Sequence, residues 1–164
     1  MAKKVADQLV DTLEKAGVRR IYAVTGDSLN EVNEAVRKNG RLRWIHVRHE
    51  ETGAYAAAAE AQLTGELACC AGSSGPGHVH LINGLYDAQR SGARVLAIAS
   101  TIPSREFGTE YFQETNTIKL FDDCSYYNQV ATTPEQFPRM LQGAMQAAIS
   151  SCGVGVIGLP GDLA

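Results

Sequence analysis

Hydrophobic and polar positions along the chain alternate between helical spacing and short apolar runs. Helical spacing predicts helices over residues 5–16, from 28 to about 38, from about 50, from about 78 to 89, and from 133 onward. Apolar runs of strand length fall at 21–24, 44–47, 67–71, 94–99 and 154–159. Several of these runs show no alternation, which is typical of strands buried on both faces. The pattern therefore predicts a three-layer α/β/α fold with a mainly parallel sheet.

Two segments carry the signature of a capping box at a helix start. Ser28–Glu31 places a hydroxyl and a carboxylate three residues apart, and Thr133–Gln136 does the same with a hydroxyl and an amide. We expect each hydroxyl to cap the helix that follows it. Residues 101–129 show weak periodicity and are predicted to form a long loop with short helical pieces.

The composition is that of one ordinary folded domain. The chain has 164 residues, of which 45% are hydrophobic and 20% are charged. A net charge of -3 argues against nucleic acid as a partner, because phosphate-binding domains usually carry a basic excess. No apolar run reaches the roughly 18 residues that would cross a membrane. The four cysteines form no C-x-x-C pair and no signal-peptide core is found, so reduced thiols and a cytoplasmic location are expected.

Three segments follow predicted strands and are candidates for a binding site: residues 25–28, 49–51 and 72–77. In open α/β sheets, ligands bind beyond the carboxyl ends of the strands, so we expect the site where these segments meet. The glycine-rich 72–77 segment matches neither G-x-G-x-x-G nor G-x-x-x-x-G-K-[ST]. From the residues alone it is either a tight structural turn or a ligand-facing loop.

Glu50 is the carboxylate with the clearest chemical potential. It begins a helix, where the helix dipole favours negative charge, and two acidic residues at a helix start need no further explanation. However, an alanine-rich turn including Ala54 follows directly. Small side chains permit close packing, which would bury the carboxyl, favour its protonated form and suit it to proton transfer. Both interpretations remain open at this point.

Other polar groups give weaker signals. His46 with His49, or His78 with His80, could suggest a metal, but no cysteine or carboxylate stands at a familiar ligand spacing, so no metal site is predicted. His80 is the better candidate for a polar contact to a ligand, since it closely follows the glycine-rich segment. The serines at 73 and 74 do not form G-x-S-x-G, which argues against a hydrolase.

Five ordered motifs together resemble a known family. They are Val24–Asn30, Arg48–Glu51, Gly72–Ala88, Tyr111–Glu114 and Leu159–Asp162. This set is similar to the N-terminal pyrimidine-binding (PYR) domain of thiamine diphosphate enzymes, and most strongly to the pyruvate oxidases and the quinone-reducing pyruvate dehydrogenase of bacteria. The resemblance covers residues 1–164 and implies the ThDP-binding fold of PYR type.

The resemblance also implies roles for individual residues. Glu50 matches the glutamate that hydrogen-bonds N1′ of the cofactor's aminopyrimidine and so promotes loss of the thiazolium C2 proton, after which pyruvate is decarboxylated and FAD takes the electrons. The residues matching the cofactor-binding loop are Gly75, Pro76, Gly77, His80 and Asn83. Those matching positions near the substrate are Asp27, Ser28, Phe112 and Gln113.

The chain departs from the family pattern in one respect. Mg²⁺ and the diphosphate are held in the family by Gly-Asp-Gly and a later Asn, whereas Gly26–Ser28 and Gly161–Leu163 read Gly-Asp-Ser and Gly-Asp-Leu. The diphosphate-binding (PP) domain and the FAD domain are therefore expected on other segments, and the chain is expected to be an excised domain or a small subunit. Alone it would be inactive. A neighbouring subunit's PP domain would complete the site in a homo-oligomer, with the alanine-rich helix as a packing surface.

Three alternatives to a pyruvate oxidase domain remain. The chain could be the separate PYR subunit of a two-chain 2-oxo acid decarboxylase, or the PYR domain of an enzyme similar to acetolactate synthase. It could also be a non-catalytic interaction module that keeps the fold for assembly. An intact Glu50 and the Phe112–Gln113 pair argue against the last of these, because assembly would not need them. Either a quinone or oxygen remains possible as the electron acceptor.

Overall fold

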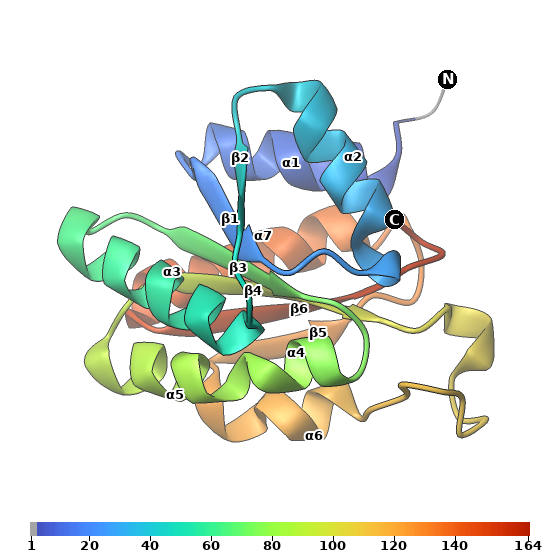
Figure 1. Cartoon of the computed structure of the whole chain (residues 1–164). Coiled ribbons are helices and arrows are strands. Elements are labelled where there is room, and N and C mark those ends of the chain that lie inside the picture. Colours follow the sequence, from blue (N-terminus) through green and yellow to red (C-terminus); the bar gives the residue numbers. More distant parts are fainter. Residues whose placement is uncertain (1–2) are drawn as a thin grey trace.

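A six-stranded sheet, parallel throughout, forms the centre of the computed structural model, which describes residues 3–164 (Figure 1). The strands run in the order β2-β1-β3-β4-β6-β5. Their bounds are β1 Arg20–Ala23, β2 Arg43–His46, β3 Ala68–Gly72, β4 Val95–Thr101, β5 Tyr127–Val130 and β6 Val154–Pro160. The central strands β3, β4 and β6 are buried along their whole length, which confirms the prediction from their unbroken apolar runs.

Helices cover both faces of the sheet and complete the predicted three layers (Figure 1). One face carries α1 (Val5–Lys15), α2 (Asn30–Asn39) and α7 (Phe137–Ser151), and the other carries α3 (Glu50–Thr64), α4 (Pro76–His80), α5 (Ile82–Ser91) and α6 (Thr117–Phe121). Short 3₁₀ turns lie at Asp27–Leu29, Ser104–Glu106 and Asp122–Cys124. Within residues 3–164, no helix has the length and apolar character needed to cross a membrane.

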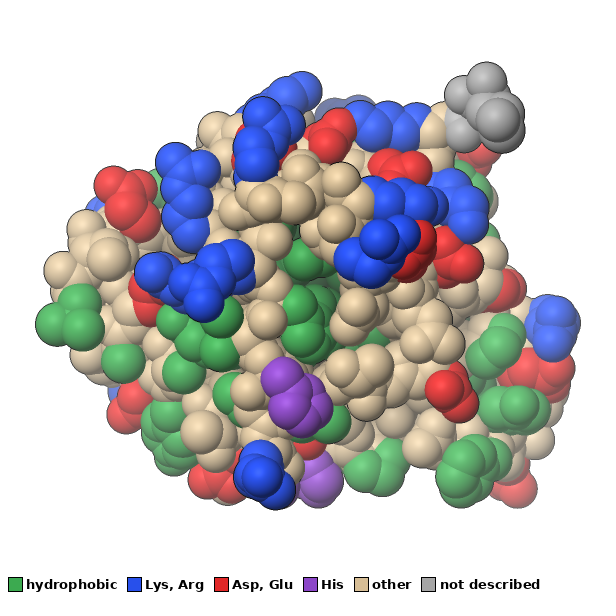
Figure 2. All heavy atoms as spheres, turned by 45° about the horizontal axis from the view of Figure 1, so that its top comes forward, with side chains coloured by type: hydrophobic (Ala, Val, Ile, Leu, Met, Phe, Trp, Pro, Cys, Tyr) green, Lys and Arg blue, Asp and Glu red, His purple; other side chains and the backbone are tan. Residues whose placement is uncertain are grey.

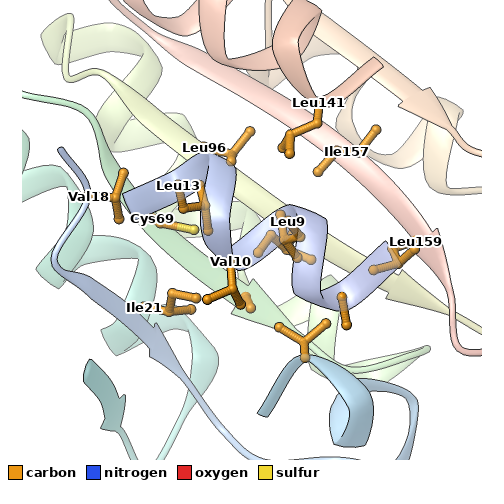
Figure 3. Packing of buried hydrophobic residues seen from close by; sticks show 14 of the residues in the cluster. Leu9, Val10, Leu13, Val18, Ile21, Cys69, Leu96, Leu141, Ile157 and Leu159 are labelled. Carbon is orange, nitrogen blue, oxygen red and sulfur yellow. The ribbon is translucent and has the colours of Figure 1, made fainter. Parts of the chain in front are cut away.

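The sheet separates two hydrophobic clusters. Figure 3 shows Leu9 and Leu13 of α1 in the first cluster, together with Leu96 and Ile157 of the sheet. The second cluster lies under α3 and α5 and contains many alanines. Because neighbouring strand residues point to opposite faces, Cys69 belongs to the first cluster and Cys70 to the second.

The capping box predicted at Ser28 is wrong. Ser28 lies inside the 3₁₀ turn and α2 begins at Asn30, without a side-chain cap. The Ser28 hydroxyl contacts Ser73 Oγ at 2.9 Å instead, while Glu31 accepts a hydrogen bond from Lys4 Nζ at 2.7 Å. A long-range contact has taken the hydroxyl that local spacing assigned to the helix start.

The start predicted for the last helix is also wrong. Thr133 does not cap it, because α7 begins at Phe137, four residues later. Gln136 does reach back, but its Oε1 accepts from Thr132 Oγ1 at 2.9 Å rather than from Thr133. The proline in the first turn of α7 is Pro138, not Pro134.

Two further elements differ from the sequence prediction. The stretch 101–129 is not a loop to its end, because its last residues form the edge strand β5, which pairs with β6 from Tyr127 to Val130. Three half-buried residues and the exposed Gln129 form this strand, so its apolar signal is weak. The single helix predicted over 78–89 is two helices, α4 and α5, which meet at Leu81.

The buried alanines of α3 pack against α5 inside this chain, and the expectation that this helix also packs against another subunit stays a prediction. Ala54, Ala57, Ala58 and Ala61 are all buried in the second cluster. A Cβ placed on Gly84 of α5 would lie only 2.5 Å from Ala54 Cβ and 2.8 Å from Tyr55 N. The small residues therefore allow α5 to approach α3 closely and fix the position of the helix that begins at Glu50.

Replacing Gly84 with alanine is expected to lower the free energy of unfolding by about 1–3 kcal/mol, because the added methyl forces α5 away from α3. The loss occurs although alanine favours a helix over glycine by about 1 kcal/mol. Urea unfolding measures it. Asp87→Ala, an exposed change on the same helix, is the control and should stay within about 0.5 kcal/mol of the parent chain. A Gly84→Ala chain as stable as the control would contradict this packing.

Candidate functional site

The three segments predicted to form a site do meet at the carboxyl ends of β1 and β3. Ser28 Oγ, after β1, accepts a hydrogen bond from the backbone N–H of Ser74 at 2.9 Å and contacts Ser73 Oγ at the same distance. A Cβ on Gly26 would lie 2.3 Å from Ser73 Oγ. The glycine-rich turn is thus held directly against the loop that follows β1.

Glu50 lies on the other side of this turn. It is the first residue of α3 and is only 8% exposed, so the burial that the alanine-rich sequence suggested is present. Its Oε2 pairs with His80 Nδ1 at 3.1 Å. A Cβ on Gly77 would lie 3.3 Å from Glu50 Oε1, so this oxygen packs against the turn where it has no side chain. Among the described residues, Oε1 makes no hydrogen bond of its own.

His49 and His80 form a stacked pair next to this carboxyl. Their ring centroids are 4.4 Å apart and their planes differ by 24°. His49 caps α3, because its Nδ1 accepts a 3.3 Å hydrogen bond from the backbone N–H of Glu51. The two rings are about half exposed, so Glu50 is shielded from solvent on one side by polar groups rather than by apolar ones.

A loop after β4 closes over the glycine-rich turn and carries Gln113. Gln113 has a positive φ of 67°, which is uncommon for a residue with a side chain. Ser74 Oγ donates to Gln113 Oε1 at 3.1 Å. Gly75, at φ 67° and ψ -122°, passes so close that a Cβ there would lie 2.7 Å from Gln113 Cβ. The two segments fit together only because Gly75 has no side chain.

All four residues expected near the substrate line one cavity of about 420 Å³. They are Asp27, Ser28, Phe112 and Gln113. Phe112 is 78% exposed at the rim, an unusual position for a large apolar side chain. A larger cavity, of about 770 Å³, lies under the same loop and also includes Gln113. Glu50 lines neither cavity, because the glycine-rich turn lies between it and the smaller one.

His78 anchors this loop to the core, a role that the sequence analysis missed. The ring is buried, with Nδ1 2.7 Å from the carbonyl oxygen of Ser100 and Nε2 2.6 Å from Thr115 Oγ1. A carbonyl can only accept, so Nδ1 carries the proton and Nε2 accepts from the Thr115 hydroxyl. Burial lowers the pKa of His78, opposed by the hydrogen bond to Ser100. The neutral ring therefore connects α4, β4 and the loop.

Acid is expected to destabilise the chain through His78. Its pKa in the folded state lies below the ordinary value of 6.5, so the unfolded chain binds a proton that the folded chain does not. The stabilisation is complete above about pH 6.5 and falls as the pH drops towards the folded-state pKa, by at most about 1.4 kcal/mol per pH unit. Urea unfolding between about pH 7 and pH 5 should show a steeper loss in the parent chain than in His78→Gln. Equal slopes in the two chains would contradict this role of His78. His46→Gln, a change at an exposed histidine, is the control and should keep the slope of the parent chain.

The structure brings most of the predicted site residues together, with one exception. Gly75 and Gly77 are buried within the turn, Pro76 is exposed on it, and His80 contacts Glu50. Asn83 is exposed on α5, and within residues 3–164 no hydrogen bond joins its side chain to the others. Local spacing gave no signal for His78 or for the His49–His80 stack, because both depend on contacts between segments far apart in sequence.

Comparison with known proteins shows the family. Residues 3–120 match the family described as thiamine pyrophosphate enzyme, N-terminal TPP binding domain. The chain belongs to this family, as the sequence motifs indicated. The site at the carboxyl ends of β1 and β3 therefore lies within the segment that the family match covers.

Relatives match nearly all of this chain, but the matched region is only part of each relative's length. A putative thiamine pyrophosphate-containing protein, YdaP, from Bacillus subtilis is 45% identical over 99% of this chain and 29% of its own length. Pyruvate oxidase from Lactiplantibacillus plantarum is 38% identical over 94% of this chain and 26% of its own length. An uncharacterized 42.6 kDa protein from Pseudomonas amyloderamosa is 56% identical over 98% of this chain and 41% of its own length. A plant acetolactate synthase, that of Brassica napus, is 32% identical over 98% of this chain and 25% of its own length. The chain thus spans between about a quarter and two fifths of these relatives.

Proposed function

We propose that residues 1–164 are the pyrimidine-binding domain of a flavin-dependent pyruvate oxidase or dehydrogenase. The observation that carries this proposal is the buried Glu50 carboxyl, whose Oε1 lies beside Gly77. The domain would supply one half of a thiamine diphosphate site. The diphosphate, its Mg²⁺ and FAD would be held by other parts of the complete protein, so the isolated chain is expected to be inactive.

The residues present fit an aminopyrimidine ring. A flat ring that approaches Glu50 needs backbone without a side chain beside the carboxyl, and Gly77 lies there. A ring nitrogen needs one hydrogen-bonding partner at its edge, and Glu50 Oε1 has no competing hydrogen bond among the described residues. His80, bound to Oε2, would keep the carboxyl oriented with Oε1 towards the ring.

Glu50 would hold and move one proton at the pyrimidine N1′. Bound thiamine diphosphate supplies the carbon nucleophile and the electron sink for decarboxylation. The carboxyl group can donate a proton to N1′ and take it back, and its burial keeps water from competing for that hydrogen bond. Because α3 is packed tightly against α5, the carboxyl is held in position before the cofactor binds.

Gln113 and Phe112 would act on the substrate side of the turn. They line the same cavity as Asp27 and Ser28, a volume of about 420 Å³. A small 2-oxo acid fits in this cavity. The Gln113 amide can hydrogen-bond a carboxylate or carbonyl oxygen, while Phe112 would exclude water once a partner domain covers it. This cover would come from a PP domain of a neighbouring subunit in a homo-oligomer.

The four cysteines support a reducing location for the complete protein. All are free, and burial raises the pKa of Cys70 to about 12 and that of Cys124 to about 11. These two buried thiols are unreactive and need no disulfide to be stable. We therefore place the protein in the cytoplasm.

The test is an activity assay on the full-length protein that contains this chain. With pyruvate, we expect carbon dioxide to be released together with reduction of an artificial electron acceptor, one two-electron reduction per pyruvate. The activity should require both thiamine diphosphate and Mg²⁺. Carbon dioxide release without reduction of the acceptor would contradict an oxidase, and formation of acetolactate would favour the alternative of an acetolactate synthase, to which this chain is also similar.

A further inference from the structure

Three side chains with metal-binding atoms converge beside the glycine-rich turn. His49, Glu50 and His80 each offer one ligand atom, and these atoms lie within 4.8 Å of one another. The face of the molecule in Figure 2 shows exposed histidine side chains close together. The sequence predicted no metal site, because only histidines close together along the chain could be paired there. The fold instead pairs His49, from the start of α3, with His80, from the end of α4.

The distances suit a tetrahedral transition-metal ion. Zinc binds nitrogen and oxygen ligands at about 2.0–2.2 Å, which sets neighbouring ligand atoms about 3.3 Å apart in a tetrahedron. Glu50 Oε2 and His80 Nδ1 are already 3.1 Å apart, so an ion can replace the proton between them with little movement. Only His49 must shift: its ring, which is 48% exposed, has to rotate out of the stack with His80 and release the Glu51 backbone N–H.

A second carboxylate stands ready to support His49. If His49 binds the ion through Nε2, its Nδ1 carries a proton and needs an acceptor. Glu51 Oε2 lies 3.9 Å from Nδ1 and can move to accept it, in place of the 3.3 Å contact from the Glu51 backbone. Carboxylates that accept from metal-bound histidines in this way strengthen metal binding.

We propose that His49, Glu50 and His80 form a binding site for Zn²⁺ or a similar transition-metal ion. Two imidazole nitrogens and one carboxylate oxygen are a donor set that suits zinc, whereas Mg²⁺ prefers oxygen ligands alone. The fourth position is open to water. An ion on Oε2 would keep Glu50 in its metal-bound carboxylate form, without a proton to share with N1′, so metal and cofactor would exclude one another; this consequence rests on the proposed function.

The site is tested by calorimetric titration of the 164-residue chain with Zn²⁺. Cys152 is exposed and could bind zinc itself, so Cys152→Ser is the background for every variant. We expect one ion per chain, and His49→Ala and His80→Ala should each weaken binding at least about 10-fold. His46→Ala removes an exposed histidine outside the cluster and should change nothing. Absence of binding, or binding unaffected by His49→Ala and His80→Ala, would overturn the site. Circular dichroism checks that each variant folds.

A second titration separates this site from the proposed function. In the full-length protein, Zn²⁺ should raise the dissociation constant of thiamine diphosphate, and His80→Ala should remove this effect of zinc. If zinc binds to the site but leaves cofactor affinity unchanged, the mutual exclusion is wrong. If the full-length protein does not bind the cofactor even without zinc, the proposed function is wrong while the zinc site stands.

Discussion

Glu50→Gln in the full-length protein is expected to slow hydrogen–deuterium exchange at C2 of bound thiamine diphosphate by about 10²–10⁴-fold. The amide has nearly the shape of the carboxyl but has no proton to transfer to N1′ and back. Because Glu50 is buried, no water is placed to take over that task. Acid quenching followed by NMR of the released cofactor measures the exchange rate.

The neighbouring residue provides the matched control. Glu51 follows Glu50 in the first turn of α3, carries the same charge and is 37% exposed. Glu51→Gln should leave the exchange rate within a factor of a few of the parent. A near-normal rate in Glu50→Gln, or an equal loss in both variants, would remove Glu50 from the proposed role.

Gly75→Ala is expected to give the second large effect, on both stability and activity. At φ 67° and ψ -122° the backbone conformation is one that side chains disfavour, and the new Cβ would lie 2.7 Å from Gln113 Cβ and 3.0 Å from its backbone. Strain and overpacking together should cost about 2–5 kcal/mol of unfolding free energy. In the full-length protein, displacement of Gln113 should lower turnover about 100-fold.

Gly40 separates backbone strain from this steric conflict. It ends α2 at φ 68°, and no atom lies within 4 Å of the position that a Cβ would take there. Gly40→Ala should therefore cost only about 1–2 kcal/mol, and turnover should not change. Urea unfolding and steady-state assays compare the two variants. An equal loss of stability in both would show that the contact with Gln113 contributes nothing.

The sequence was sufficient where one local pattern decides the structure. The apolar runs of β3, β4 and β6 predicted strands buried on both faces, and Glu50 does begin α3. The segments after the strands were correctly expected to meet, since parallel strands end on one edge of the sheet. Asp27, Ser28, Phe112 and Gln113 line one cavity, while the role near the substrate that the resemblance implied for them stays a prediction.

The errors came from groups whose partners lie far away in sequence. Ser28 has the right spacing for a helix cap, but its hydroxyl is 2.9 Å from Ser73 Oγ, 45 residues away. Nothing in the sequence around His78 showed that its ring is buried and bonded to Ser100 and Thr115. The alanines of α3 correctly indicated close packing, but spacing could not show that the packing partner is α5 of the same chain.

A structure of the full-length protein with thiamine diphosphate and Mg²⁺ tests the central claim most directly. The measurement is the distance from Glu50 Oε1 to N1′ of the aminopyrimidine. We expect a hydrogen bond of about 2.6–3.2 Å, with the ring lying beside Gly77. A pyrimidine ring bound elsewhere, or a Glu50 carboxyl that contacts only water and His80, would contradict it.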